Sequence, residues 1–391
     1  MLTHLFRLIW NKKGQNFLLI LEIFLSFMGL CAAFTFILYP YNNYKLPRGF
    51  EPENVWVVNF GGAGEIKSID SLQVFRESLK KTLLSINGIE DVTYTSASIP
   101  FSGSSSSSDV KYNGQEVWSY FYSAEDSYHK VLGLKLLDGR WFNNDDNSSN
   151  QRTVVINEVL KKELFGDESP LGKIVTSDAY KMKIVGVVQA TKDESEFEGI
   201  SPGLFMRIDT SDMRYNNWML IKVKGGADAA FEGRVYKTLS NTAKSANIEI
   251  AHLTDMMAVK DKTMGIAFTV FCIIAGFLIS NVALGIFGVL WFNIHKRRGE
   301  IGLRRAVGAT GRAISGQMVA EALLIATIAM AIGTAFAIQF PLLNLLSLPA
   351  ANYVTAIICS ILFIYVLVIL CALYPGRQAA GIYPATALHE D

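Results

Sequence analysis

One stretch of the sequence contains the glycines and the lysine from which a phosphate-binding loop is built. Residues 166–173 read GDESPLGK, and a phosphate loop would surround a nucleotide phosphate with backbone N–H groups and a lysine ammonium. The spacing does not suit that chemistry, because one residue too many separates Gly166 from Gly172. Ile174 also stands where a Ser or Thr would bind magnesium. We therefore expect no nucleotide site in this segment.

Other residue types that support catalysis or metal binding are dispersed along the chain. The five histidines are His4, His129, His252, His295 and His389. No His/Cys spacing is typical of a zinc site, and no G-x-S-x-G elbow or carboxylate pair points to hydrolysis. We therefore expect that the chain is not an enzyme by itself and that it holds no cofactor and no metal.

A basic segment, residues 297–310 (RRGEIGLRRAVGAT), has the composition of a short helix that binds a partner. Glu300 and Arg304 stand four residues apart, in the order that favours an ion pair on a helix surface. The apolar side chains of the segment are Ile301, Leu303, Ala306 and Val307. Gly308 offers a helix end. Such a helix can bind in a groove of another protein, and the alternative is a solvated basic loop that contacts anionic lipid.

Four runs of apolar residues are each long enough to cross a bilayer, which requires about 20 residues. They cover residues 17–39, 263–292, 318–340 and 353–373. Four runs of this length favour membrane spans over buried helices of a water-soluble protein. The first run is too long for a signal peptide and is followed by no small-residue cleavage site, so we expect an uncleaved anchor.

The distribution of lysine and arginine predicts the orientation of the spans. Basic residues precede the first span and fill the loop between the second and the third, whereas residues 341–352 carry no charge. We therefore expect a multi-pass membrane protein with both termini in the cytoplasm. The parts between the spans are a cytoplasmic N-terminal segment (1–16), a large periplasmic or extracellular domain (40–262), a cytoplasmic loop (293–317), a short external loop (341–352) and a cytoplasmic tail (374–391). The net charge of +1 gives no reason to expect nucleic acid as a partner.

The large external segment has the pattern of a mixed α/β domain. Asn113-Gly114 between alternating apolar residues predicts a β-hairpin over residues 110–122. Apolar periodicity predicts helices over 71–84 (with Ser71 as N-cap), 158–165 and 231–246, and strands over 55–60, 92–99, 153–156 and 182–188. The cysteines are Cys31, Cys272, Cys359 and Cys371. All four fall within the expected spans, so this domain is expected to fold without disulfides.

Three groups of motifs occur along the chain in a fixed order. One group is the basic segment 297–310. The second comprises 133–142 (GLKLLDGRWF), 154–158 (VVINE), 164–166 (LFG), 170–173 (PLGK) and 184–188 (IVGVV). The third comprises 374–380 (YPGRQAA) and 383–388 (YPATAL). In their order along the chain, the motifs resemble the MacB/FtsX-like family of ABC transporter permeases, and the group within residues 133–188 is similar to the MacB-like periplasmic core domain.

The resemblance implies an α-helical protein of the bacterial cytoplasmic (inner) membrane, with four transmembrane helices in a one-plus-three arrangement and a large extracytoplasmic α/β domain between the first and the second. It also implies a separate ABC ATPase subunit, which would bind ATP and Mg²⁺ and contact the cytoplasmic loop. The residues that it assigns to ATPase coupling are Glu300, Ile301, Gly302, Leu303, Arg304, Arg305, Ala306, Val307 and Gly308. Gly299 and Gly311 depart from the family pattern, in which charged residues are common at these positions.

Polar and small residues within the spans are candidates for helix packing. Glu22 and Glu321 lie near the expected cytoplasmic ends of their spans, where packing or coupling is favoured over a proton relay. Small residues four apart allow close helix approach, and they occur as Gly276 and Ser280 in the second span and as Ala329, Gly333 and Ala337 in the third. The spacing is compatible with contacts in a permease dimer and with packing inside one chain.

The resemblance implies a function in which ATP hydrolysis by the partner moves the extracytoplasmic domain, a process called mechanotransmission. We expect this motion to serve export or extraction of a peptide, a lipid-linked molecule or a drug. The alternative is an FtsX-like transmembrane regulator of a cell-wall hydrolase or of an antimicrobial-peptide response. The expected partners are the ABC ATPase, a second identical or different permease subunit, membrane lipids and an extracytoplasmic adaptor or effector.

Overall fold

The computed structural model describes residues 13–61, 68–143, 145–146, 151–209, 212–243, 246–296, 298–343 and 348–380. It consists of two compact units. The helical unit contains the chain up to residue 41 and from residue 265, and the α/β domain contains residues 42–264.

The helical unit contains long apolar helices. The helices that reach into or lie within this unit are α2 (Lys13–Tyr44), α7 (Leu253–Lys296), α8 (Arg298–Ala306), α9 (Gly311–Ala337), α10 (Gln339–Leu342) and α11 (Ala350–Ala380). Within the described residues, four stretches are long and apolar enough to cross a membrane: Phe17–Tyr44, Leu253–Lys296, Gly311–Leu342 and Ala350–Pro375. The α/β domain lies in the sequence between the first and the second of them, so the expected fold class is confirmed.

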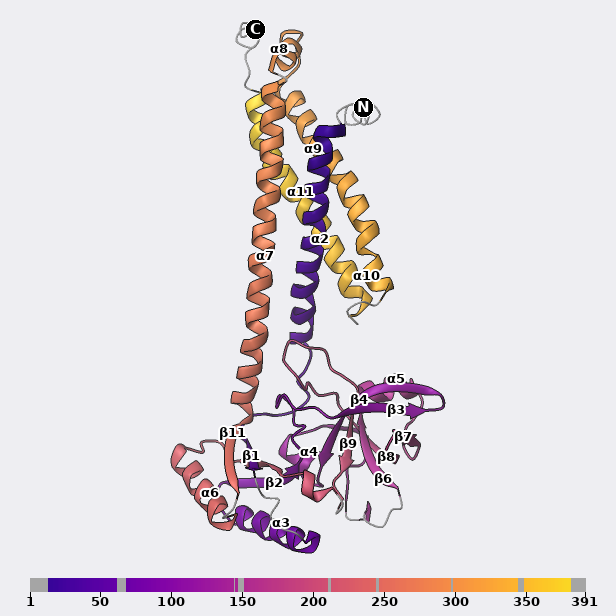
Figure 1. Ribbon diagram of the computed structural model, residues 1–391, viewed down its shortest axis with the longest axis vertical. Coiled ribbons are helices and arrows are strands. Elements are labelled where there is room, and N and C mark those ends of the chain that lie inside the picture. The colour runs from indigo at the N-terminus through magenta and orange to yellow at the C-terminus, as the bar shows by residue number, and fades with distance from the viewer. Residues whose placement is uncertain are drawn as a thin grey trace. The chain divides into compact units, whose positions relative to one another are not determined.

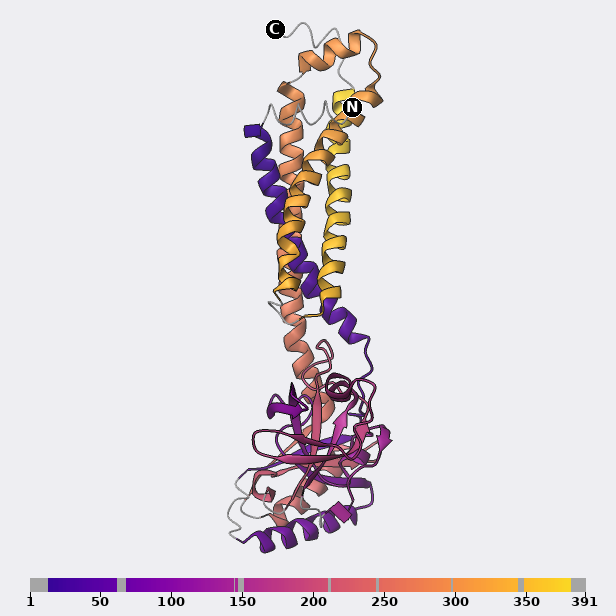
Figure 2. The same ribbon diagram turned by 90° about the vertical axis from the view of Figure 1, so that its right-hand side faces the viewer.

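The long helices of the unit run alongside one another and share an apolar core (Figures 1 and 2). Ile23 and Phe27 of α2 are almost completely buried there, together with Ala326 of α9 and Ile364 of α11. Aromatic contacts extend this packing, since the ring centroids of Phe24 and Phe336 lie 5.7 Å apart. Because lipid is itself apolar, the fit of side chains, more than the exclusion of water, stabilises such a bundle.

The α/β domain has two lobes. The first, the α/β lobe, is built from β1 (Val55–Gly61), α3 (Ile69–Leu84), β2 (Ile89–Thr95), β10 (Trp218–Val223), α6 (Ala229–Thr242) and β11 (Asn247–His252). Its strands are all antiparallel and lie in the order β11-β1-β10-β2. This connectivity is the split βαβ arrangement known as ferredoxin-like.

The two faces of this sheet bury different side chains, as the period of two along a strand requires. Trp56 and Val58 of β1 lie on the face that α3 and α6 cover, and both helices appear together below the sheet in Figure 1. Val55 and Val57 lie on the opposite face and enter a second apolar core.

The second lobe, the barrel lobe, is inserted between β2 and β10. Its elements are β3 (Ser107–Tyr112), β4 (Gln115–Ala124), α4 (Tyr128–Val131), β5 (Leu136–Gly139), β6 (Arg152–Asn157), α5 (Glu158–Phe165), β7 (Ile174–Thr176), β8 (Lys181–Val188) and β9 (Gly203–Arg207), and η3 (Met213–Tyr215) follows it. Strand pairing runs β4-β3-β7-β8-β6-β9 and returns to β4 through the parallel pair of β9 with β4. The strands therefore form a closed ring, with β5 paired to β8 outside it.

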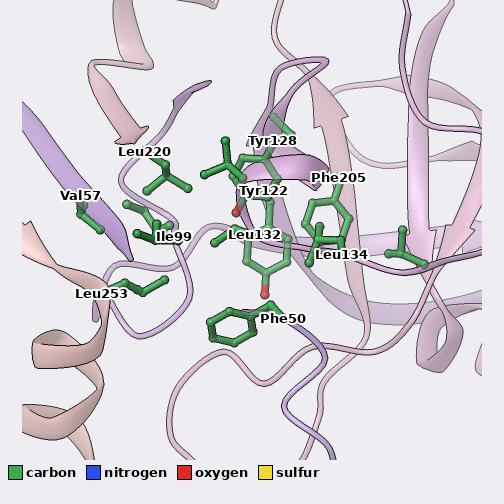
Figure 3. Close-up of a cluster of buried hydrophobic side chains, with 14 of the residues drawn as sticks. Phe50, Val57, Ile99, Tyr122, Tyr128, Leu132, Leu134, Phe205, Leu220 and Leu253 are labelled. Atoms are coloured by element: carbon green, nitrogen blue, oxygen red, sulfur yellow. The ribbon is translucent and has the colours of Figure 1, made fainter. Parts of the chain in front are cut away.

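A shared core joins the lobes. Figure 3 shows Tyr122, Tyr128 and Phe205 of the barrel lobe gathered in the same cluster as Val57 of β1 and Leu253 of α7. These five side chains are at most 5% exposed. The cluster is large and apolar, so it holds the lobes together without fixing which polar groups face each other.

Several predicted elements are confirmed and some boundaries are corrected. Asn113 and Gly114 both have positive φ, 49° and 82°, as the tight hairpin turn between β3 and β4 requires. The Ser71 N-cap prediction is wrong, because α3 begins at Ile69 and Ser68 precedes it with extended backbone. The acidic Asp70 in this first turn favours the earlier start.

Two further boundaries differ from the expected ones. The strand expected over 92–99 begins earlier and ends at Thr95, because residues beyond it turn out of the sheet, where the Ile99 N–H donates to the Ala97 carbonyl. The helix expected over 231–246 begins at Ala229, where the Asp228 carboxylate caps the Phe231 N–H. It ends at Thr242, since β11 already starts at Asn247.

Candidate functional site

The candidate site is the short helix α8 and its junction with α9. The helix ends because Gly308 takes a φ of 102°, which side chains rarely tolerate. The Val307 N–H donates to the Leu303 carbonyl at 3.1 Å and the Ala309 N–H to the Arg304 carbonyl at 3.0 Å, so the last carbonyls remain satisfied. Thr310 then caps α9 by accepting from the Ala313 N–H at 3.3 Å.

One apolar side chain of α8 packs against the neighbouring helices of the same chain. Ile301 is 3% exposed and packs with Ile294 of α7 and with Ile314 and Met318 of α9. A buried side chain of this size contributes roughly 1.5–3 kcal/mol to the attachment. The sequence predicts Ile301 as one of the residues that contact the ATPase, but in the structure its side chain is buried against α7 and α9.

The opposite side of α8 is open and partly apolar. Leu303 is 57% exposed and Val307 is 82% exposed, and Ala306 between them is exposed as well. A groove of about 360 Å³ runs beside them, and its lining residues are Leu303, Arg304, Val307, Ala309, Ala313, Ile314 and Gln317. An exposed aliphatic edge beside a groove is the geometry with which short helices engage another protein.

Polar side chains join α8 to α9. Arg304 Nη2 donates to Glu300 Oε1 at 2.6 Å, and its Nη1 donates to Gln317 Oε1 at 2.9 Å. Gln317 Nε2 in turn donates to Glu321 Oε1 at 3.0 Å. Because Glu300 and Arg304 are about half exposed, their pair adds little stability and serves mainly to orient the guanidinium. The sequence analysis did not identify Gln317. The one feature that could have indicated its role is its position four residues before Glu321, which places both side chains on the same face of a helix.

The other predicted coupling residues occupy the same segment. Gly302 is buried and Gly308 forms the turn just described. Arg305 lies within α8, but its side chain is outside the described residues, as is all of Arg297. The described part of this segment therefore presents an exposed aliphatic helix edge beside a groove.

Family models match most of the chain. The MacB-like periplasmic core domain matches residues 29–235, and the FtsX-like permease C-terminal domain matches residues 272–384, which include α8. The chain belongs to the MacB/FtsX-like ABC transporter permeases.

Relatives of this permease occur in Gram-negative and Gram-positive bacteria. The macrolide export ATP-binding/permease protein MacB of Neisseria gonorrhoeae is 26% identical over 319 residues, covering 76% of this chain and 47% of that protein. The uncharacterized ABC transporter permease YknZ of Bacillus subtilis is 24% identical over 324 residues, covering 81% of this chain and 79% of that protein. The permease thus spans about half the length of the MacB relative.

A solved structure is also similar. The crystal structure of the periplasmic region of MacB from Actinobacillus actinomycetemcomitans is 22% identical, with a TM-score of 0.40. The match covers 56% of this permease and 97% of that chain.

The small residues of α9 pack inside the permease's own bundle. Ala329 and Ala337 are buried, and a Cβ added to Gly333 would come within 2.4 Å of the Phe27 ring of α2. Gly276 of α7 differs, because no described atom outside its own helix backbone lies within 4 Å of an added Cβ. Ser280 donates to the Gly276 carbonyl at 2.9 Å. Ala329, Gly333 and Ala337 of α9 therefore pack within the chain, whereas Gly276 and Ser280 of α7 are exposed.

Glu22 packs against the backbone of α7. A Cβ at Gly285 would lie 2.0 Å from Glu22 Oε1, so only glycine leaves room for this carboxyl group. Sequence reasoning identified Glu22 but missed Gly285, because nothing local in the sequence marks the two as neighbours.

The segment that superficially has phosphate-loop composition lies in the barrel lobe between α5 and β7. A phosphate loop leads into a helix whose N-terminus faces the phosphate, whereas this loop leads into a strand. Lys173 is paired with Glu168 and lies over the Tyr112 ring, 5.5 Å from its centroid. Among the described residues, no three or more His, Cys, Asp or Glu side chains are grouped to hold a metal ion.

Proposed function

We propose that the exposed edge of α8 (Leu303, Ala306 and Val307) docks into a groove of a separate ABC ATPase. The observation that carries this proposal is that the apolar side chains of α8 lie on two sides of the helix. Ile301 is buried against α7 and α9, whereas Leu303 and Val307 are exposed. Because Ile301 attaches α8 to α7 and α9, a force applied to the exposed edge of α8 is transmitted to both of these helices.

In this proposal, the basic loop lies in the cytoplasm together with both termini, and residues 42–264 lie outside it. The lysine and arginine asymmetry supports this orientation. ATP and Mg²⁺ bind to the ATPase, and closure of two ATPase subunits moves α8 in each of two paired permeases. α7 is one continuous helix from Leu253 to Lys296, so its displacement reaches the start of the helix in the α/β domain. The work serves export or extraction of a substrate that is already outside the cytoplasm, a peptide, a lipid-linked molecule or a drug.

The decisive variant is Leu303→Asp. Loss of a buried aliphatic contact of roughly 1.5–3 kcal/mol corresponds to about 10-fold to 150-fold weaker ATPase association. The measurement is co-purification of the cognate ATPase with each permease variant in detergent, together with the yield of the permease.

Two variants serve as controls. Val74→Asp places the same charge on another exposed aliphatic position, on α3, where Val74 is 66% exposed, and should leave ATPase recovery unchanged. Arg312→Ala removes an exposed charge outside α8 and should be mild, within about 1 kcal/mol. Equal ATPase recovery with Leu303→Asp and wild type would show that the loop is only a basic anchor.

A further inference from the structure

A polar loop of the barrel lobe connects to both helices that enter the α/β domain. Residues Lys192–Glu198, which we call the clasp loop, lie between β8 and β9. On one side the loop contacts the end of α2 and the residues after it, and on the other it contacts the first turns of α7. All of these contacts lie within the α/β domain.

The contacts with the α2 side are both polar and aromatic. Asn43 Nδ2 donates to the Phe197 carbonyl at 3.2 Å, and the Tyr44 ring stacks on the Phe197 ring with centroids 5.5 Å apart. The Arg48 guanidinium forms an ion pair with Glu196, and the Lys192 N–H donates to the Arg48 carbonyl at 3.0 Å.

The contacts with α7 come from two consecutive residues. Lys260 Nζ forms an ion pair with Glu194 Oε2 at 3.1 Å. Asp261 Oδ1 accepts two hydrogen bonds, from the Ser195 hydroxyl and from the Glu196 N–H, each at 3.1 Å. Hydrogen bonds to an ionised carboxylate are stronger than neutral ones and fix direction as well as distance.

A buried ion pair holds the loop in this shape. The Lys192 side chain is 0% exposed, and its Nζ donates to Glu196 Oε2 and to the Glu196 carbonyl, both at 2.9 Å. Glu196 is thus shared between Lys192 inside the loop and Arg48 outside it. Separating Glu196 from Lys192 would leave the buried ammonium of Lys192 without a charged partner, so the loop cannot easily adopt a second arrangement.

Chain connectivity gives these contacts their significance. α2 leads into β1, and β11 leads into α7, so both helices are joined by backbone to the α/β lobe. Neither helix adjoins the barrel lobe in sequence. The barrel lobe contacts α7 through the apolar cluster around Leu253 and Met257 and through the clasp loop. Apolar surfaces can slide over each other, whereas the paired charges of the clasp loop specify one register.

We propose that the clasp loop transmits movement of α2 and α7 to the barrel lobe, while the backbone connections transmit it to the α/β lobe. This inference rests on the proposed function, because it requires an ATP-driven displacement of the helices. It assigns a coupling role to Asp261 and Lys260 on α7 and to Glu194, Ser195 and Glu196 on the loop.

The test compares two distances in the full-length permease, reconstituted with its ATPase in lipid nanodiscs. The four native cysteines are replaced by alanine, and spin labels are attached in pairs to cysteines at exposed positions. One pair, Lys262 with Glu163, reports on α7 and the barrel lobe, and the other, Lys262 with Lys81, reports on α7 and the α/β lobe. Distances are measured by pulsed electron spin resonance with and without a non-hydrolysable ATP analogue.

Asp261→Ala should uncouple the barrel lobe selectively. Because the clasp loop should make the barrel lobe follow α7, the Lys262–Glu163 distance of wild type should be nearly independent of the ATP analogue. In Asp261→Ala this distance should become broader and should change when the analogue binds. The change in the Lys262–Lys81 distance and the ATPase rate should remain those of wild type. Lys260→Ala, which removes a partly exposed ion pair, should act in the same direction with a smaller effect. Asp255→Ala removes another carboxylate from the same helix, one that is 79% exposed, and should change neither distance.

Two outcomes are adverse and can be told apart. If both distances behave in Asp261→Ala as they do in wild type, the clasp proposal is overturned and the apolar core suffices for coupling. If the distance between labels at Lys262 in two paired permeases does not depend on the ATP analogue while the ATPase remains bound, mechanotransmission by this permease fails, and the clasp proposal fails with it.

Discussion

Two ion pairs with the same spacing in sequence occupy opposite environments in this permease. Glu300 and Arg304 lie on the surface of α8, with side chains 51% and 42% exposed, whereas Lys192 and Glu196 of the clasp loop are 0% and 10% exposed. Water screens the first pair, and the desolvated charges of the second depend on each other. A four-residue spacing therefore says nothing about the energetic weight of a pair until burial is known. We expect the first pair to be dispensable and the second to be essential to its lobe.

The largest effect should follow from breaking the buried pair. Glu196→Gln leaves the Lys192 ammonium, whose side chain is 0% exposed, without a carboxylate partner, and we expect a loss of about 3–5 kcal/mol in the free energy of unfolding of the α/β domain. Urea unfolding of the full chain in detergent, followed by tryptophan fluorescence, measures this value. The double variant Lys192→Met/Glu196→Leu should recover part of the loss, because no unpaired charge then remains buried. If the single variant were as stable as wild type, the buried pair would contribute no more to stability than the exposed pair of α8.

A second prediction concerns Asp193, the neighbour of Lys192 in the clasp loop. Burial raises the pKa of this carboxyl group from 3.8 to about 7. Between these values the folded state keeps the proton that the unfolded state releases, so stability should fall as pH rises from about 4 to about 7 and level off above. The loss should amount to about 2 kcal/mol between pH 5 and 7.

Asp193→Asn isolates this contribution, since the amide does not ionise. Urea unfolding of the full chain at several pH values should show a weaker pH dependence for this variant and a higher stability than wild type at pH 8. The same slope in both proteins would assign the pH dependence to other carboxyl groups, such as Glu198, whose pKa burial also raises.

The smallest effect should come from the exposed pair. Glu300→Gln removes one charge from α8 and should weaken ATPase association by about 0–1 kcal/mol, which is at most about 5-fold. Titration of the ATPase onto the immobilised permease at two salt concentrations would measure this difference. A loss as large as that of Leu303→Asp would mean that charge, and not the aliphatic edge, dominates the contact.

Local features of this permease could be predicted from the sequence. The four long apolar helices follow from run length alone, and the hairpin at Asn113-Gly114 follows from the two positive φ values that this dipeptide tolerates. The C-terminal end of α8 at Gly308 and its surface ion pair could also be predicted from the sequence. What could not be predicted depends on distant partners. Ile301 has the same composition signal as Leu303, and only the packing of α7 and α9 decides which of them is buried.

The closed ring and the clasp loop were beyond sequence reasoning for the same reason. β7 has three residues and pairs with β3 at a single position, Lys111 with Thr176. Such a short strand has no alternating pattern from which the closed ring of strands could be predicted. Asp261 lies 65 residues from the Glu196 N–H that it binds. Its role is visible only when the two segments are brought together.

The insertion of the barrel lobe within the α/β lobe has a consequence for the order of folding. β1, α3 and β2 are made first, but β10 lies between β1 and β2 in the sheet and begins only at Trp218. The barrel lobe is contiguous in sequence, so the cost in chain entropy of closing its loops is smaller. During synthesis and translocation, the first strands must wait unpaired until the whole barrel lobe has passed and β10 arrives. Unpaired strand edges are prone to aggregation, so the interval before β10 is available is the stage at which this domain is most exposed to it.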